Sequence, residues 1–514
     1  MKPIDEQLQR IRQTDRDHPR KRVIILGAGV AGLVAAYELQ KLGHAVEVIE
    51  GSGRVGGRVR THRFNDGHDQ YNELGAMRIP ASHDYTRHYV ATCNLKLRPF
   101  ITAHNNLRCF YDIRGIQTRI QDASKTLFPQ FSLSPAERRL TNAAVAPAIL
   151  GSHFSDAILN LTADEESDLF TFRPSTLRAL QLDSQSLLDF LQQRLRGTDT
   201  LELIGSTTGL EMLWNKSIAM FLRDEIIGTG DGLEEIKGGM DLLPTGLAKL
   251  IPANPIRLNT EVTAIRWEGN QGKILLSGEK HEVSEIQPTH VICTIPFPVL
   301  RRLDLAGFSS EKMRAIRNLT YASSTKVLIH CKRRFWEQSP YDIFGGATLS
   351  DQIIRSTYYP SDNAPAPGRP VVASRAKGVL TAYSLEGPTV ARSPDISNGP
   401  GVLLGSYCWG ADARRLGGMS ANERATCVID KIARFHPEIR DYADDHASMS
   451  WDENKWAGGA FSFLEPSDQA RYLAAACQSE GNFHFAGEHC STDQAWIQGA
   501  AMSALRAVEE IVSK

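Results

Sequence analysis

The pattern of apolar and polar positions is most informative in the first fifty residues. Residues 23–26 (Val-Ile-Ile-Leu) form a continuous apolar run, which is typical of a parallel strand buried on both faces. Residues 30–42 follow with an amphipathic helical pattern, and residues 45–49 form a second apolar run. The pattern therefore predicts a strand, a helix and a second strand, which together open an α/β domain.

The turn between the first strand and the helix is a G-x-G-x-x-G sequence. Gly27 permits a tight turn, Gly29 lets the backbone approach a pyrophosphate, and Gly32 lets the helix pack closely on the strand. Glu50 closes the second strand, where a carboxylate can accept hydrogen bonds from an adenosine ribose. The helix N-terminus supplies free N–H groups to phosphates. The predicted dinucleotide-binding positions are Gly27, Gly29, Val30, Ala31, Gly32 and Glu50.

A second glycine-rich loop, residues 53–58 (Gly-Arg-Val-Gly-Gly-Arg), follows directly. A nicotinamide cofactor does not need it, whereas FAD continues beyond its pyrophosphate into a ribityl chain and a ring. Arg54 and Arg58 can donate charge-assisted hydrogen bonds to phosphate oxygens, and Gly57 belongs to the glycine doublet. The segment resembles the signature of the flavin-containing amine oxidase superfamily, which implies FAD as the cofactor.

The end of the chain carries a second strand–glycine–acid–helix unit. Residues 482–486 predict a short strand, Gly487 and Glu488 follow it, and an amphipathic helix runs from about Trp496. The resemblance implies that Glu488 contacts the phosphate–ribityl region and that the helix N-terminus points at the flavin ring. It also implies that residues 256–265 form a strand whose backbone at Val262 binds the adenine. The further cofactor positions it implies are Gly75, Ala76, Met77, Arg78, Ala495, Trp496 and Ile497.

These units predict an α/β fold (α+β overall) with a discontinuous, Rossmann-like FAD-binding domain of the glutathione-reductase/amine-oxidase type. A mixed-sheet substrate domain and a helical lobe complete the prediction. We assign residues 20–75, 238–300 and 470–514 to the FAD-binding domain, residues 1–19, 76–110 and 301–469 to the substrate-binding domain, and residues 111–237 to the helical domain.

Composition narrows the class of protein further. The 514 residues carry 58 Lys+Arg against 59 Asp+Glu, so no net field favours nucleic acid or an anionic membrane. No apolar run reaches the ~20 residues of a membrane helix, and the charged N-terminus lacks the apolar segment of a secretory signal. The eight cysteines include no CxxC pair, so neither a metal site nor a redox motif is expected. We expect a cytoplasmic protein that forms a homodimer or a higher homo-oligomer.

Three local matches resemble the L-amino acid oxidase branch of the superfamily. The first is residues 73–80 (Glu-Leu-Gly-Ala-Met-Arg-Ile-Pro). Its arginine, Arg78, is implied by the resemblance to bind the substrate carboxylate. Residues 401–413 carry Tyr407, which is implied to bind the same carboxylate, and Trp409 two residues on. Lys326, in the apolar run 325–329, is implied to hold a water at the flavin and to act when O₂ is reduced.

Two positions depart from related patterns. Monoamine oxidases attach the flavin covalently through a cysteine, but the matching position here is Ala460, so FAD should be bound non-covalently. Some secreted amino acid oxidases have a histidine proposed as a base, and an alignment through residues 239–241 places Arg223 there. The predicted substrate-binding residues are Arg78, Arg223, Tyr358, Tyr407, Trp409, Ala460, Ala495 and Trp496, with Arg78, Lys326 and Tyr407 as the catalytic group.

The resulting hypothesis is oxidative deamination of an L-amino acid by O₂, with hydride transfer from Cα to the flavin, giving an α-keto acid, ammonia and H₂O₂. The alternative on the same scaffold is an L-amino-acid 2-monooxygenase, which decarboxylates its substrate to the amide, and a non-catalytic FAD-binding scaffold is a third. Trp409, Trp451 and Trp456 favour a large neutral substrate side chain. An inward-facing acid would favour a cationic one, and the candidates are Asp224, Glu225 and Asp231.

Overall fold

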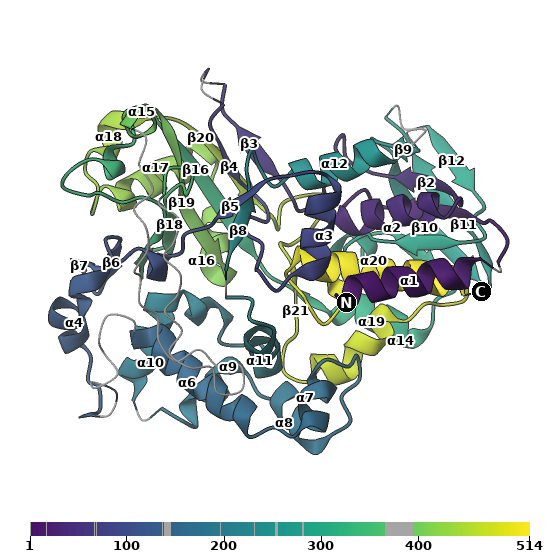
Figure 1. Cartoon of the computed structure of the whole chain (residues 1–514), viewed down its shortest axis with the longest axis horizontal. Helices are drawn as coiled ribbons and strands as arrows, with labels where there is room; N and C mark the ends of the chain where they lie inside the picture. The colour runs from purple at the N-terminus through teal and green to yellow at the C-terminus, as the bar shows by residue number, and fades with distance from the viewer. Residues whose placement is uncertain are drawn as a thin grey trace.

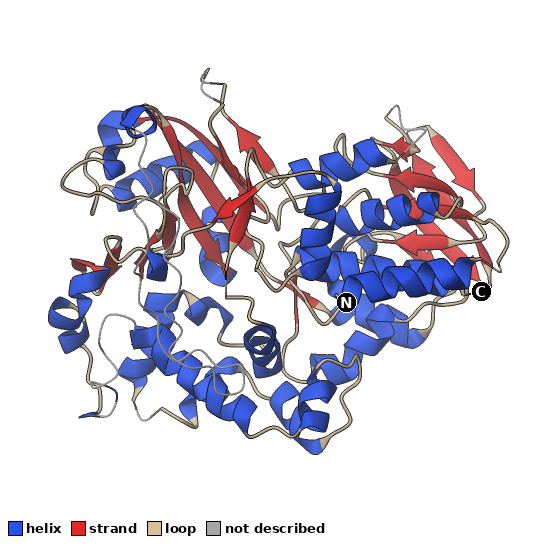
Figure 2. Cartoon of the chain, viewed as in Figure 1, coloured by secondary structure: helices blue, strands red, loops and turns tan. Residues whose placement is uncertain are grey.

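Two sheet-containing lobes and one helical lobe make up the chain in the computed structural model (Figure 1). The structure describes residues 2–513 except 17, 66, 68, 136, 138–144, 196, 231, 252–254, 280–281 and 365–393. Strands dominate the two upper parts of the view in Figure 2, and helices form its lower edge. Both chain termini lie in the lobe on the right of Figure 1, which also holds the predicted cofactor-binding unit.

A five-stranded parallel sheet forms the centre of that lobe, in the order β22-β13-β1-β2-β9. Its first strand is buried from Val23 to Leu26, as expected for a strand covered on both faces. The strands predicted near residues 23–26, 45–49 and 482–486 are therefore confirmed. The bounds are β1 Arg22–Leu26, β2 Ala45–Ile49, β9 Ile256–Arg257, β13 Val291–Cys293 and β22 Phe483–Phe485.

Helices from both ends of the chain cover this sheet. The apolar faces of α2 and α20 share one core with the strands, and α1 adds Ile4, Leu8 and Ile11 to the same core. Residues 1–19 were assigned to the substrate domain, but the buried face of α1 packs against α20, so they belong beside the parallel sheet. The helices of this layer are α1 Pro3–Asp15, α2 Val30–Lys41, α3 Asp84–Thr92, α12 Leu242–Leu250 and α20 Ile497–Val512.

A four-stranded sheet, in the order β12-β11-β10-β14, extends this lobe. Residues 256–265, expected to be one strand, are split between two sheets. Asn259 adopts a left-handed backbone (φ 51°), which ends β9 before β10 begins at Glu261. The strands are β10 Glu261–Glu268, β11 Gln271–Ser277, β12 Val283–Ile286 and β14 Asp304–Ala306. The helices that share a core with them are α13 Phe297–Leu300, α14 Ser310–Asn318 and α19 Ala474–Cys477.

A seven-stranded sheet, in the order β20-β16-β19-β18-β17-β6-β7, forms the second lobe. Residues 110–119 belong to it, because Tyr111 pairs in parallel with Leu349; the boundary expected at residue 111 therefore falls within a strand. The strands are β6 Phe110–Ile113, β7 Ile116–Arg119, β16 Ser324–Cys331, β17 Ala347–Ser350, β18 Ser356–Tyr358, β19 Gly401–Trp409 and β20 Ala443–Ser450. The helices beside them are α15 Pro394–Asn398, α16 Gly410–Gly417, α17 Ala421–Ile432 and α18 Ile439–Tyr442.

Short helices make up the third lobe, at the lower edge of Figure 1. One of these helices begins at Leu187, because the Ser186 hydroxyl accepts a hydrogen bond from the Asp189 N–H and so caps it. No helix in the described ranges is both long and apolar enough to cross a membrane. The bounds are α4 Ala123–Thr126, α6 Val145–Leu159, α7 Ala163–Leu169, α8 Leu177–Asp183, α9 Leu187–Gln192, α10 Thr198–Thr208 and α11 Ile218–Ile227.

Three two-stranded ribbons connect these parts: β3 with β4, β5 with β8, and β15 with β21. Their bounds are β3 Thr61–Arg63, β4 Tyr71–Glu73, β5 Leu97–Pro99, β8 Glu234–Ile236, β15 Thr320–Tyr321 and β21 Ser462–Phe463. The first ribbon ends immediately before Gly75 and Arg78. Most of the Pro/Gly-rich stretch between residues 360 and 400 lies outside the described residues.

Candidate active site

One cavity of about 730 Å³ receives residues from all three lobes. This volume lies within the usual range of about 300–1,000 Å³ for ligand pockets. The cavity begins where β1 and β2 end, at Gly27 and Glu50, as ligand sites of parallel α/β sheets do. It continues past Lys326 of β16 and Tyr407 of β19 to Asp224 of α11. The cofactor-binding and substrate-binding predictions therefore concern one continuous space.

The glycine-rich turn has the geometry that phosphate binding requires. Gly27 adopts φ 105°, a conformation that glycine tolerates and other residues rarely adopt. A Cβ on Gly32 would lie 2.0 Å from the Gly27 carbonyl oxygen, so this position needs glycine for close packing. A Cβ on Gly29 would meet no protein atom within 4 Å, because that side faces the cavity. The N-terminus of α2, at Val30 and Ala31, also lines this space.

Glu50 is fixed in place by the loops on either side of it. Its Oε2 accepts a hydrogen bond from the Ala28 N–H at 2.8 Å, and its Oε1 accepts from the Ser52 N–H at 2.9 Å and the Ser52 hydroxyl at 2.7 Å. The carboxylate is buried and lines the cavity. These bonds hold the acid at the end of β2, where a ribose can reach it.

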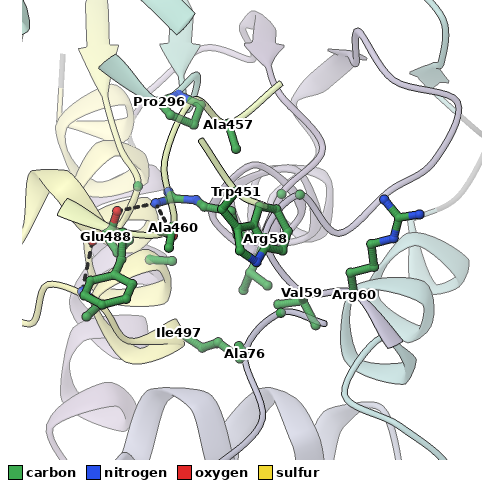
Figure 3. Close-up of a pocket in the computed structure, with 18 of the residues that line it drawn as sticks. Arg58, Val59, Arg60, Ala76, Pro296, Trp451, Ala457, Ala460, Glu488 and Ile497 are labelled. Atoms are coloured by element: carbon green, nitrogen blue, oxygen red, sulfur yellow. Dashed lines mark hydrogen bonds and ion pairs between the residues drawn. The ribbon is translucent and has the colours of Figure 1, made fainter. Parts of the chain in front are cut away.

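The arginines of the second glycine-rich loop have different partners. Arg58 forms an ion pair with Glu488, 2.6 Å between Nη1 and Oε1, and also donates to the Ala460 carbonyl (Figure 3). Arg54 donates to the carbonyls of Val55, Gly57 and Val59, so it shapes its own loop. Both arginines line the cavity, but their guanidinium groups are already engaged by the protein.

Arg60 is a cation that belongs to none of the motifs found in the sequence. It lines the cavity, and its side chain has no hydrogen bond or ion pair with any described residue. In Figure 3 it lies apart from the Arg58–Glu488 pair. In the sequence, only its position two residues after Arg58 could have indicated that Arg60 lies in the cavity wall.

Glu488 joins the C-terminal unit to the rest of the site. Its carboxylate accepts hydrogen bonds from the Ser462 N–H and hydroxyl, the Ala495 N–H and Arg58. Burial alone would raise the pKa of Glu488, but the Arg58 guanidinium, His489 and the Ala495 N–H together outweigh it, and the pKa is lowered. Ala495 has φ 69°, an uncommon conformation for a residue with a side chain. The Ala495–Trp496–Ile497 segment then leads along the cavity wall into α20.

Lys326 extends from β16, the second strand of the seven-stranded sheet, into the cavity wall. Its Nζ donates to the carbonyls of Gly75 at 2.7 Å and Glu73 at 3.2 Å, and lies 4.5 Å from the centre of the Tyr407 ring. Burial lowers the pKa of Lys326, and the Glu73 carboxyl only partly counteracts this. Burial likewise raises the pKa of Glu73. The amine can therefore lose its proton far more easily than an exposed lysine.

Arg78 and Tyr407 face the same cavity. Among the described residues, Arg78 has no ion pair and no side-chain hydrogen bond, although it lies in a mostly enclosed space. Burial raises the pKa of Tyr407 to about 12, against the nearby positive charge of Arg78. The Tyr407 and Trp409 rings meet edge to face, 4.9 Å between centres. The site thus offers an anionic ligand an unpaired guanidinium beside a phenol.

Most of the remaining predicted positions also line the cavity. These are Gly57, Gly75, Ala76, Met77, Val262, Ala460, Gly487, Ala495, Trp496 and Ile497. Trp451 and Trp456 line it too, and the Trp451 indole N–H donates to the Leu74 carbonyl. No cysteine is found among the described residues of its wall.

Two predicted substrate-binding residues lie elsewhere. Arg223 is buried outside the cavity wall, where it donates to the carbonyls of Thr492 and Leu169 and to the Gln469 side chain. The reason is helical rotation: on α11, the next residue, Asp224, faces the cavity instead. Tyr358 packs behind Tyr407, 6.4 Å between ring centres, and supports that ring. Glu225 does not line the cavity, and Asp231 lies outside the described residues.

The arrangement fits the expected FAD. The glycine turn and helix N-terminus can receive a pyrophosphate, Glu50 a ribose, and the loop of residues 53–58 with the Arg58–Glu488 pair the continuation of the cofactor. Beyond these residues, Lys326, Arg78 and Tyr407 surround the end of the same space. The residues that can bind the cofactor and the cationic site that can bind a second ligand therefore line one undivided cavity.

Comparisons with known proteins agree with this geometry. The family model for flavin containing amine oxidoreductase matches residues 30–512. The flavin-dependent L-tryptophan oxidase RebO of Lentzea aerocolonigenes is 36% identical over 511 residues, covering 96% of this chain and 98% of that protein. An L-amino-acid oxidase of Siganus canaliculatus is 28% identical, covering 95% and 85%. The solved structure of a putrescine oxidase has a TM-score of 0.71 at 17% identity, covering 96% and 100%.

Proposed function

We propose that this chain, which belongs to the flavin-containing amine oxidoreductase family, is an L-amino-acid oxidase. FAD is its cofactor. The proposed reaction is oxidative deamination: the Cα–H bond of the amino acid breaks, O₂ is reduced to H₂O₂, and the imino acid is hydrolysed to an α-keto acid and ammonia. The observation that carries the proposal is Arg78, a cation in the cavity wall with no acidic partner among the described residues.

Arg78 and Tyr407 give the substrate its orientation. A carboxylate that enters this enclosed space loses its water shell, so it needs a fixed cation and a hydrogen-bond donor in exchange. The Arg78 guanidinium supplies the first and the Tyr407 hydroxyl supplies the second. An amine without a carboxylate would leave the half-buried Arg78 without a partner in the cavity wall, which argues against a simple amine substrate. Holding the substrate carboxylate at two points orients the Cα–H bond, and positioning of this kind can lower a barrier by about 7–11 kcal/mol at its best.

FAD, when bound, supplies the redox chemistry: it accepts the hydride and returns the electrons to O₂. The residues of the chain orient the substrate and handle charge. Lys326, with its lowered pKa, can accept a proton or hold a water through its Nζ at the cavity wall. No histidine lines the described part of the cavity, so the amine loses its proton either in solution before entry or to a group such as Lys326.

The test is an assay of the purified holoprotein with a panel of L-amino acids, their D-enantiomers and the decarboxylated amines. We expect H₂O₂ and α-keto acid in equal amounts from L-amino acids only. Turnover of amines would overturn the role of Arg78. An amide product with CO₂ in place of keto acid would identify the protein as an amino-acid 2-monooxygenase instead.

A further inference from the structure

Asp224 is an acidic side chain in an apolar part of the cavity wall. It lies on α11 close to Met220 and Phe221, which line the same space, and Leu213 adds to that apolar surface. Asp224 itself is only half-buried, because one side of it faces the cavity. Neither the clamp formed by Arg78 and Tyr407 nor the cofactor-binding loops explain an acid at this place.

One oxygen of Asp224 is engaged and the other is available. Oδ1 accepts a hydrogen bond from the Trp496 indole N–H at 3.2 Å, and this bond fixes the direction of the carboxyl group. Among the described residues, none donates a hydrogen bond to Oδ2. Burial raises the pKa of Asp224 to about 7, because the Trp496 hydrogen bond replaces only part of the lost hydration.

The neighbouring cation does not neutralise this acid. Arg223 precedes it on α11, but its guanidinium points to Gln469 and to the carbonyls of Leu169 and Thr492, and it forms no ion pair with Asp224. Asp493 and Glu225 add further negative charge nearby and also raise the pKa of Asp224. The surroundings of Asp224 are therefore acidic, and its Oδ2 lacks a hydrogen-bond donor or a cation.

We propose that Asp224 determines the substrate side chain: its Oδ2 accepts a hydrogen bond from an N–H group at the far end of that side chain. The preferred substrates are then amino acids such as L-Trp, with an indole N–H, or L-Lys and L-Arg, with a cationic end. This inference rests on the proposed L-amino-acid oxidase activity and names the substrate class for it. Arg78 and Tyr407 hold one end of the amino acid, and Asp224 holds the other.

The chemistry of the wall supports this choice of class. A purely apolar side chain would cover Asp224 and strip it of water without giving it a partner, which costs free energy. A site that hydrogen-bonds a polar group rejects analogues that lack the group more strongly than an apolar site rejects a small change in size. An acidic side chain would meet like charge. Among large substrates, those with a terminal N–H donor are the ones that satisfy both the apolar wall and the acid.

The experiment compares matched substrates in four proteins that retain their flavin. The pairs are L-Lys with L-norleucine, which lacks the terminal amine, and L-Trp with 1-methyl-L-Trp, which lacks the indole N–H. The proteins are wild type, Asp224→Asn and Asp224→Leu, with Glu225→Gln as the control for loss of a neighbouring acid that does not line the cavity. Flavin absorbance and circular dichroism check that each variant is folded and loaded.

We expect kcat/KM in the wild type to favour the N–H-bearing member of at least one pair by about tenfold or more. A high L-Lys ratio identifies the ammonium as the donor, and a high L-Trp ratio identifies the indole. Asp224→Leu should bring the ratio close to one, and Asp224→Asn should abolish an ammonium preference but keep part of an indole preference. Glu225→Gln should leave both ratios unchanged at pH 8.5, where the Asp224 carboxyl is ionised with or without the Glu225 charge.

Ratios near one in the wild type, or a ratio that survives Asp224→Leu, would overturn the role of Asp224 while leaving the oxidase activity standing. Failure of the activity itself has a different signature. It would show as no H₂O₂ from any member of the whole L-amino-acid panel in the wild type, and both proposals would then fall.

Discussion

Arg58 and Glu488 form an ion pair, 2.6 Å between Nη1 and Oε1, although 430 positions separate them in the chain (Figure 3). The pair joins the loop after β2 to the loop before α20. Each residue belongs to a strand–glycine–charge unit, one at each end of the sequence. The cofactor-binding half of the cavity is therefore closed by the two ends of the chain, and its integrity depends on this contact.

Replacing Glu488 with Gln should weaken FAD binding. The change removes the charge that Arg58 faces and disturbs the bonds to Ser462 and Ala495. Charge-assisted hydrogen bonds contribute about 1.5–3 kcal/mol, so we expect roughly a tenfold to hundredfold rise in the dissociation constant of FAD. Flavin fluorescence during dialysis measures it. Glu47→Gln, which alters an acid on β2 away from the cavity, is the control; equal flavin retention in both variants would contradict the role of Glu488.

Arg78→Met should abolish amino acid oxidation and leave the flavin spectrum intact. Removing one partner of a carboxylate–cation pair in an enclosed site costs about 3–5 kcal/mol, which corresponds to a fall in kcat/KM of about two to four orders of magnitude. Steady-state H₂O₂ production measures this. Arg78→Lys keeps the charge but not the planar fork, so it should recover only part of the activity. Wild-type efficiency in Arg78→Met would remove the residue from the substrate site.

Lys326→Met should slow oxidation of the reduced protein by O₂ much more than it slows reduction by substrate. Lys326 is buried in the cavity wall with a lowered pKa, so its Nζ can hold a water or pass a proton to the oxygen that is being reduced. We expect at least about a tenfold difference between the two effects. Stopped-flow absorbance follows each half-reaction separately. If both half-reactions slowed equally, or if neither slowed, this role of Lys326 would be wrong.

Acid precipitation should release FAD into the supernatant. Ala460 occupies the position at which related enzymes carry the covalent cysteine, and no cysteine lines the described part of the cavity. The eight cysteines of the chain are free thiols. Absorbance of the supernatant near 450 nm, compared with that of the pellet redissolved in denaturant, measures the released fraction. Flavin retained in the pellet would mean a covalent link through another residue.

The sequence predicted those parts of the site whose signals are local. The glycine turn, Glu50 and the Gly487–Glu488 unit follow strands directly, so their positions in space follow from the fold of a few residues. Lys326 and Tyr407 could be placed for the same reason, because alternation along a strand decides which face a side chain occupies. These two are paired across β16 and β19 in the structure.

Other parts depend on contacts that no local pattern encodes. On a helix, a shift of one residue turns the side chain by about 100°, so an alignment that is one position off exchanges Arg223 for Asp224. The N-terminal segment was expected only to be charged and polar, and nothing in its sequence says that α1 packs against α20. Arg60 lacks a motif altogether. Pairings between distant segments, such as β6 with β17, likewise required the structure.

The preference for a basic side chain should depend on pH through Asp224. Burial raises the pKa of this carboxyl to about 7, with Asp493 and Glu225 adding to the rise and Arg223 and the Trp496 hydrogen bond opposing it. A carboxyl with a raised pKa is neutral below that value and charged above it, whereas the side-chain ammonium of L-Lys stays charged until about pH 10. The attraction between them therefore appears as the pH rises.

We expect the ratio of kcat/KM for L-Lys to that for L-norleucine to increase by about tenfold between pH 5.5 and 8.5 and then to level off. Taking the ratio cancels the titration of the α-amine and of the Lys326 region, which both substrates share. Asp224→Asn should make the ratio independent of pH, and a ratio that falls with pH in the wild type would contradict the contact.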